Sequence, residues 1–301
     1  MQATLTTRTA VPYPIVAAIT KADDILGKGR QWNSVNGLQH RFITRYLKSA
    51  SEIASIPEIE SIASRNADEI NAFLAARGFQ IKLDPFVPSP NEDPFGTASV
   101  LDVLVEWLEE GTKAVVVTPD QKEYPGVRIS GEGVRYYQAQ GVSVEPIISL
   151  QTKSGDRVCL TMSDFGDGED GFDLVAAVRY LSKNKEPFGE YAGVTFPKVD
   201  LDQQVDISWL KEMWTIDAVG ARAKVTQALQ QTKFKMNEKG ARAKSGVAIG
   251  IMRSKSVRVP PPELVINRPF LLWIERDGLS QPLFAGHVCE DTWRDPGSLD
   301  M

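Results

Sequence analysis

Two strongly apolar segments near the C-terminus constrain the fold of this chain more than any other feature. They are "FLLWI" at residues 270–274 and "PLFAGHV" at residues 282–288, and "RDG" lies between them. Short, continuous apolar runs bounded by turn residues are typical of buried strands, and the intervening Gly predicts a β-hairpin. We therefore expect this hairpin to lie inside a sheet-rich core.

Further short strands are predicted upstream of the hairpin. They are "KAVVVTP", "YPGVRI", "GVRYYQAQ", "EPIISLQT", "DRVCLTMSD", the proline-containing "YAGVTFPK" and the alternating "TKFKM". Gly155 and Asp156 supply a hairpin turn. "ASVLDVLVEWLEEG" satisfies both the helix and the buried-strand pattern, so both remain open for it. An amphipathic helix is expected over "VDISWLKEM" at residues 205–213.

The first part of the chain predicts mainly helix. Apolar residues at helical spacing begin at Leu38, and a second helix is expected over residues 66–77, capped by Asn66 or Ser64 and ended by Gly78. "FQIKLDPF" at residues 79–86 alternates like a strand. The proline-rich stretch that follows marks an internal boundary. We predict one domain over residues 1–301, with a short helical part (1–95) and a sheet-rich core (96–301).

Composition and charge exclude some classes of protein. A net charge of -5 argues against a surface built to hold nucleic acid. The N-terminus lacks the pattern of a signal peptide and no apolar run reaches transmembrane length, so we expect a cytoplasmic chain, or one exported without a recognisable signal, and no membrane partner. Cys159 and Cys289 lie in apolar stretches and are expected to be buried thiols.

Motifs for catalysis and for metal binding are missing. The chain has only two histidines, and His287 sits on an apolar strand, where a structural, hydrogen-bonded role is expected. No nucleophile elbow, phosphate loop or cysteine pair at metal spacing occurs. The acidic loop at residues 164–173 lacks the ligand spacing of an EF-hand, so capping of the next helix is the preferred reading. We predict no enzyme activity, no cofactor and no metal.

The C-terminal third resembles the serpin family of serine protease inhibitors. The resemblance rests on an ordered set of motifs: "FPKVDLDQQVDISWLKEM", "NEKG" at residues 237–240, "PPELVINRPFLLWI" at 261–274 and "SQPLFAGHV" at 280–288. It extends more loosely back to about residue 98. It implies an α+β fold with three β-sheets covered by helices, in which the helix at residues 66–77 lies across the main sheet, and an exposed reactive loop at about residues 240–260.

Such a fold implies inhibition by a suicide mechanism. A target peptidase cuts the loop and forms an acyl-enzyme, and the loop then inserts as a strand into the central sheet before the ester hydrolyses. The expected partner is a peptidase, and the chain is expected to be a monomer.

The expected hinge of this loop carries a pattern suited to insertion. Small, uncharged residues alternate with cations after Gly240, and in an extended strand the two sets point to opposite faces. One set can enter the sheet while Arg242 and Lys244 stay in water. The predicted hinge residues are Glu238, Gly240, Ala241, Ala243, Ser245 and Val247.

Two positions are open for the reactive bond. Counting from the hinge favours Arg253 and Ser254, whereas counting back from "PPEL" favours Arg258 and Val259; Lys255 is a further candidate. We prefer Arg253, because insertion length is set from the hinge side. Every candidate is cationic, so trypsin-like peptidases with an acidic specificity pocket are the expected targets.

The short N-terminal part leaves an alternative. Typical serpins have more chain before the matched part, so a serpin-like protein that binds a partner or ligand, or is cleaved as a substrate, remains open, with an unrelated enzyme a distant third. The pentapeptide "GARAK" occurs at residues 220–224 and again at the hinge, 240–244. The first copy is interpreted as a surface helix or turn.

Overall fold

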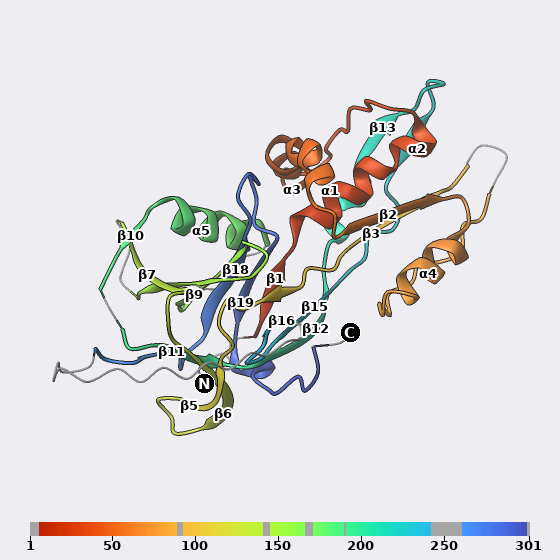
Figure 1. Cartoon of the computed structure of the whole chain (residues 1–301). Helices are drawn as coiled ribbons and strands as arrows, with labels where there is room; N and C mark the ends of the chain where they lie inside the picture. Colours follow the sequence, from red (N-terminus) through yellow and green to blue (C-terminus); the bar gives the residue numbers. More distant parts are fainter. Residues whose placement is uncertain are drawn as a thin grey trace.

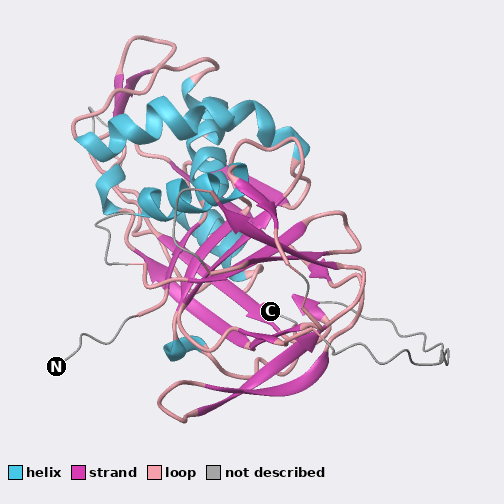
Figure 2. Cartoon of the chain, turned by 90° about the vertical axis from the view of Figure 1, so that its left-hand side faces the viewer, coloured by secondary structure: helices cyan, strands magenta, loops and turns pink. Residues whose placement is uncertain are grey.

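The computed structural model describes residues 6–88, 93–140, 145–165, 171–189, 191–241 and 261–299. Figure 2 shows most of the helices gathered at one end of the molecule and the strands at the other. Across these ranges no helix is long and apolar enough to cross a membrane. The predicted loop residues 242–260 lie outside the described part.

The predicted C-terminal hairpin lies inside the largest sheet. This sheet has seven strands, all antiparallel, in the order β1-β19-β18-β9-β8-β7-β10. Their bounds are Arg8–Ala10 (β1), Val134–Ala139 (β7), Ile147–Gln151 (β8), Arg157–Met162 (β9), Lys185–Pro187 (β10), Phe270–Glu275 (β18) and Phe284–Val288 (β19). Hairpins join β8 to β9 and β18 to β19, and Gly155 and Gly278 have positive φ at their turns, as expected for the turn residues the sequence supplied.

The strand β18 is buried on both faces. Phe270, Leu272 and Ile274 belong to one apolar cluster, which also holds Phe234 and Phe284. Leu271 and Trp273 belong to a second cluster, on the face that α5 covers. The continuous apolar sequence of β18 follows from this position between two layers.

A second sheet has four strands in the order β17-β11-β6-β5. They are Thr112–Val117 (β5), Glu123–Ile129 (β6), Val194–Pro197 (β11) and Leu264–Val265 (β17). The remaining strands form pairs: β2 (Ile59–Ser64) with β3 (Gly96–Leu101), β4 (Val105–Glu106) with β16 (Gly240–Ala241), β12 (Val199–Val205) with β15 (Gln230–Met236), and β13 (Trp214–Ile216) with β14 (Arg222–Lys224). The ambiguous segment at residues 98–111 is therefore strand at residues 98–101 and 105–106, and no part of it is helix.

Helices cover the sheets (Figure 1). They are α1 (Pro12–Lys21), α2 (Asp23–Leu26), α3 (Gly37–Arg41), the π-turn η1 (Phe42–Tyr46), the 3₁₀ segment η2 (Leu47–Ser55), α4 (Ala67–Ala75), α5 (Gly171–Lys183) and the 3₁₀ turns η3 (Ser208–Leu210) and η4 (Glu290–Thr292). Asn66 caps α4 by accepting the N–H of Asp68, and Gly78 ends the helical turn with φ 80°, as predicted. α4 packs on β2 and β3.

Two element predictions are wrong. Residues 79–86 form no strand, because their backbone N–H groups are taken by side-chain amides: Gln231 accepts from Gln80, and Asn71 accepts from Leu83. The helix expected over residues 205–213 is reduced to the single turn η3. Glu212 has a positive φ of 67°, which ends any helix there.

The aromatic stack of Phe234 on Phe284 joins β15 to the large sheet. The two rings are stacked with centroids 4.7 Å apart, and both side chains are buried. Phe234→Ala is expected to lower the free energy of unfolding by about 3–5 kcal/mol, because it leaves a cavity between the layers. Phe188→Ala removes the same side chain at an exposed position, and it should change the free energy of unfolding by roughly 0.5 kcal/mol. Urea unfolding measures both, and equal losses would contradict this packing.

Candidate functional site

Strands β3 and β15 are joined at one end only. β3 leads into β4, and β15 leads through a two-residue turn, Glu238–Lys239, into β16. β16 then pairs antiparallel with β4, with Gly240 opposite Glu106 and Ala241 opposite Val105. Within the described ranges, β3 itself pairs only with β2, and β15 only with β12. We call residues 237–241 the hinge turn and the space between β3 and β15 the slot.

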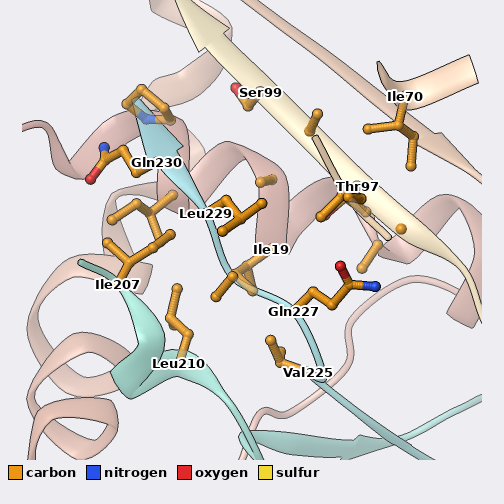
Figure 3. A pocket seen from close by; sticks show the side chains of 18 of the residues that line it. Ile19, Ile70, Thr97, Ser99, Ile207, Leu210, Val225, Gln227, Leu229 and Gln230 are labelled. Atoms are coloured by element: carbon orange, nitrogen blue, oxygen red, sulfur yellow. The ribbon is translucent and has the colours of Figure 1, made fainter. Parts of the chain in front are cut away.

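The slot is a real cavity. Every residue of β3, and every residue of β15 except Met236, lines a cavity of about 940 Å³. Figure 3 shows Thr97 and Ser99 along β3, Leu229 and Gln230 across from them, and Ile19 of α1 below Leu229 in this view. Ile70 of α4 lines the cavity too. The facing edges of both strands thus border an apolar space rather than each other.

Gly240 allows the chain to reverse at the top of the slot. Its φ is 142°, and a Cβ at this position would lie 2.4 Å from the carbonyl oxygen of Val105 and 2.9 Å from the Cα of Glu106. No side chain fits so close to a neighbouring backbone. Because of this approach, the chain that leaves Gly240 already runs antiparallel to β4, toward the slot.

Hydrogen bonds from side chains and backbone, including donors in the chain just after β4, hold the hinge turn in place. The buried Trp107 donates its indole N–H to the carbonyl of Asn237 at 3.0 Å, and the N–H of Gly111 donates to the carbonyl of Glu238 at 2.7 Å. The side-chain oxygen of Asn237 accepts the N–H of Lys239 at 2.9 Å. The turn is therefore fixed by neighbours that are remote in sequence.

A buried lysine lies directly beneath the hinge turn. The ammonium of Lys198, in the link between β11 and β12, is only 4% exposed and lies 2.7 Å from carboxylate oxygens of both Glu238 and Asp295. Lys198 donates a hydrogen bond to Asp295, and the same ammonium pairs with the Oε2 atom of Glu238.

Lys198, Glu238 and Asp295 stabilise one another in their charged forms. Burial opposes ionisation of Lys198, but its two carboxylate partners outweigh burial and raise its pKa. Burial likewise opposes ionisation of Glu238, and the nearby ammonium nevertheless lowers its pKa. The hydrogen bond from Lys198 lowers the pKa of Asp295. All three groups are charged at neutral pH.

The segment at residues 79–86 covers the other end of the slot. Gln231 of β15 accepts the N–H of Gln80 at 2.7 Å, and Gln227 exchanges hydrogen bonds with the backbone of Asp84 at 2.8 and 3.3 Å. Phe79, Ile81 and Leu83 line the cavity. This segment is held in place by side-chain amides, not by a β-ladder.

The predicted site residues fall into two groups. Glu238, Gly240 and the backbone of Ala241 lie at the junction described above. The remaining hinge residues Ala243, Ser245 and Val247, and the reactive-bond candidates Arg253, Ser254, Lys255, Arg258 and Val259, lie outside the described residues. The sequence reasoning assigned no role to Lys198, Asn237 or Trp107. A lone Lys between Pro197 and Val199, in an otherwise apolar run, was the one available signal.

His287 and the two cysteines, which the sequence analysis also singled out, have structural roles. His287 is buried and its Nε2 lies 3.1 Å from the carbonyl oxygen of Ser163, so the predicted hydrogen-bonded role is confirmed. Both cysteines are buried and form no disulfide with each other, and burial raises the pKa of Cys159 to about 12. The part of the chain that the structure describes holds no group of His, Cys, Asp and Glu that could bind a metal ion.

The first "GARAK" is not a helix. Gly220 takes a positive φ of 88° in a turn, and Arg222–Lys224 forms β14, which pairs with β13. The interpretation as a turn is confirmed for Gly220, and the helical alternative is wrong.

Known proteins resemble this chain in sequence over a limited range. The serpin (serine protease inhibitor) family model matches residues 190–291. Plasminogen activator inhibitor 1 from Neovison vison is 39% identical over 66 residues, which are 22% of this chain and 16% of that protein. The Bos taurus protein of the same name is 38% identical over 66 residues, 15% of its length. The matched part is thus about a sixth of these curated relatives.

Solved structures resemble it over nearly the whole chain. SRPN18 from Anopheles gambiae has a TM-score of 0.59 at 12% identity and covers 96% of this chain and 93% of its own. A serpin from Schistosoma mansoni has a TM-score of 0.59 at 13% identity, with 94% and 95% covered. Thyroxine-binding globulin in complex with thyroxine has a TM-score of 0.56 at 12% identity, with 93% and 92% covered. At these identities the likeness shows the fold.

The two copies of "GARAK" offer a matched test of the junction. Gly240→Ala should lower the free energy of unfolding by roughly 2–5 kcal/mol, because it adds a backbone clash and breaks the pairing with β4. Gly220→Ala also places a Cβ at positive φ, but nothing lies within 4 Å of it, so about 1 kcal/mol is expected. Urea unfolding followed by tryptophan fluorescence compares them, and equal losses would show that the junction is not closely packed.

Proposed function

The chain is a member of the serpin family, and we propose that it inhibits serine endopeptidases as a suicide substrate, by cleavage of a loop at residues 240–260 and insertion of that loop between β3 and β15. The slot supports this because it offers two unpaired strand edges and an apolar cavity, with a chain already turned toward it. Its activity is the trapping of another enzyme, not a catalysis of its own.

The register of the hinge turn is the observation that carries the proposal. Continued along β15 from the bridge between Asn237 and Gly240, it would set Ala243 opposite Phe234 and Ser245 opposite Thr232. Directly opposite residues of an antiparallel pair share a face. Phe234 and Thr232 are buried. The small residues would therefore point inward, as the alternation of the sequence requires.

The register along β3 assigns the same loop residues to the same faces of the sheet. Continued from the pairing of Ala241 with Val105, it would set Gly246 opposite Val100 and Ala248 opposite Ala98 on the outward face. Val100 and Ala98 pack against α4. Small residues at positions 246 and 248 would fit under this helix, which agrees with the absence of cations between Lys244 and Arg253.

The length of the slot supports Arg253 as the residue before the reactive bond. In the same register Gly250 would lie opposite Gly96, the first residue of β3. Arg253 would then lie just beyond the far end of the slot, so the attached peptidase would be carried along its full length. Arg258 would require further inserted residues for which β3 offers no partner. A cationic residue here suits trypsin-like peptidases, whose specificity pocket is acidic.

Trypsin is the first target to test, with a variant that exchanges two neighbours. The native chain should form a complex with trypsin that survives SDS, and loop cleavage should raise the melting temperature. The double variant Ala243→Lys with Lys244→Ala keeps the composition and net charge but moves a cation to the inward face. It should be cleaved without trapping, because burying that charge costs several kcal/mol.

Lys244→Ala alone is the matched control and should trap like the native chain. Trapping by the exchanged variant would contradict insertion in this register. Cleavage without any complex, in the native chain and with several serine peptidases, would favour the second candidate, a serpin that is a substrate or a binding protein.

One feature of the slot favours that second candidate. In the register along β15, Arg242 would lie opposite Lys235 and Lys244 opposite Lys233. Like charges directly opposite one another are destabilising by roughly 0.2–1 kcal/mol for each pair. Asp202 lies 3.2 Å from Lys233 and offsets part of this repulsion. Insertion is therefore expected to be slowed by charge.

Lys235→Glu should consequently increase the fraction of cleaved loop that ends as covalent complex, by about two- to fivefold at low salt. Lys48→Glu makes the same change of charge at an exposed position in η2, outside β15 and the hinge turn, and should have little effect. The measurement is the ratio of complex to cleaved chain on SDS gels. A matching rise for both variants would mean that net charge, and not the pairing partner of Arg242, sets the outcome.

A further inference from the structure

The chain that follows β19 contacts the hinge turn. Residues 290–299 leave the large sheet through η4, which packs on β12, and the side chain of Leu299 lines the slot. Three contacts connect this segment to the hinge turn and the slot, through Asp295, Gly297 and Leu299. Each reaches a different part of the site.

The first contact is an ion pair. Asp295 accepts a hydrogen bond from Lys198 at 2.7 Å, while the same ammonium lies 2.7 Å from Glu238 of the hinge turn. Asp295 is 46% exposed, whereas Lys198 is buried. Among the described residues, Lys198 thus has two anionic partners. Glu238 belongs to the hinge turn, and Asp295 belongs to the C-terminal segment.

The second and third contacts reach the turn and the cavity. The side-chain amide of Asn237 donates to the carbonyl of Gly297 at 3.2 Å, and the same side chain shapes the turn by accepting the N–H of Lys239. The buried side chain of Leu299 lines the cavity of the slot. The segment therefore bonds to the outside of the hinge turn and borders the space that an inserted strand would fill.

The start of the segment is firmly anchored. Trp293 is buried, with its ring 5.1 Å from that of Tyr124 in an edge contact and 6.1 Å from that of Phe270. Tyr124 donates its hydroxyl to Glu290 at 2.8 Å. Beyond Trp293, Arg294 forms only a half-exposed pair with Asp200, and residues 297 and 298 are exposed. The segment is therefore anchored at Trp293 and partly exposed beyond it, and such a segment can be released locally.

We propose that residues 295–299 form a clasp that holds the hinge turn against β4 and must be released before a strand can enter the slot. Asp295 is its positioning residue, because it orients the ammonium of Lys198 beneath Glu238. This inference rests on the proposed function only for its consequence, which is that the clasp sets the rate of loop insertion. The holding of the hinge turn is a property of the fold itself.

Hydrogen exchange of the hinge turn tests the clasp without a peptidase. The amides of Gly111, Asn237 and Gly240 donate to carbonyls within or against the turn, so their exchange reports its opening. Asp295→Asn removes the charge but keeps a side-chain oxygen for the N–H of Gly297, which Asp295 accepts at 3.0 Å. It should speed exchange of these amides by about tenfold, the usual effect of losing a hydrogen bond between charged groups.

The controls separate the clasp from general loosening. Arg294→Gln breaks the neighbouring surface pair and should leave hinge exchange unchanged, and Asp295→Glu should restore most of the protection. A chain that ends at Arg294 should exchange at least as fast as Asp295→Asn. Unchanged exchange in both clasp variants, or equal acceleration by Arg294→Gln, would overturn the proposal.

Trapping of trypsin gives a separate readout. If the clasp sets the insertion rate, Asp295→Asn should form covalent complex several-fold faster than the native chain and than Arg294→Gln. The exchange of the hinge amides could be faster in Asp295→Asn although neither the native chain nor any variant traps a serine peptidase. That result would support the clasp and reject the proposed function. Trapping at an unchanged rate, despite faster exchange, would overturn the consequence drawn for insertion.

Discussion

The pairing of β16 with β4 is the interaction on which the rest of the site depends. It joins two halves of a sheet, β2–β3 and β12–β15, at one end and leaves their facing edges apart. Unpaired strand edges are templates for another strand, and an unfilled apolar cavity forfeits dispersion contacts that a well-packed core would make. The molecule therefore retains free energy that a strand placed in the slot would release. The short junction joins the two strand pairs at one end, where Gly240 and Ala241 run antiparallel to β4.

Local signals in the sequence were sufficient for several of the elements. The cap at Asn66, the stop at Gly78 and the turns at Gly155 and Gly278 depend on backbone chemistry within a few residues, so they could be predicted. Residues 79–86 could not, because their alternation is that of a strand. The amide side chains that take their N–H groups come from Asn71 on α4 and from Gln227 and Gln231, at or just before the start of β15. Tertiary contacts overrode the local pattern there.

Sequence reasoning about the site used a pattern along one stretch and could not foresee a meeting of distant segments. The hinge residues were predicted from alternation after Gly240, and for Ala243, Ser245 and Val247 this stays a prediction, because they lie outside the described residues. Lys198, Trp107 and Asp295 act because β11–β12, β4 and the C-terminal segment converge on the turn, and no spacing along the chain encodes that convergence. The two copies of "GARAK" make the same point, since Gly220 has open space around it and Gly240 lies against the backbone of β4.

The convergence on Lys198 also explains how one residue can couple three parts of the molecule. A buried ammonium has to keep a carboxylate partner, because an unpaired charge at that depth is costly. With both Glu238 and Asp295 in contact, either partner can leave while the other remains, so the hinge turn can open without stranding the cation. The shared pair thus makes a junction that is closed at rest and still able to move.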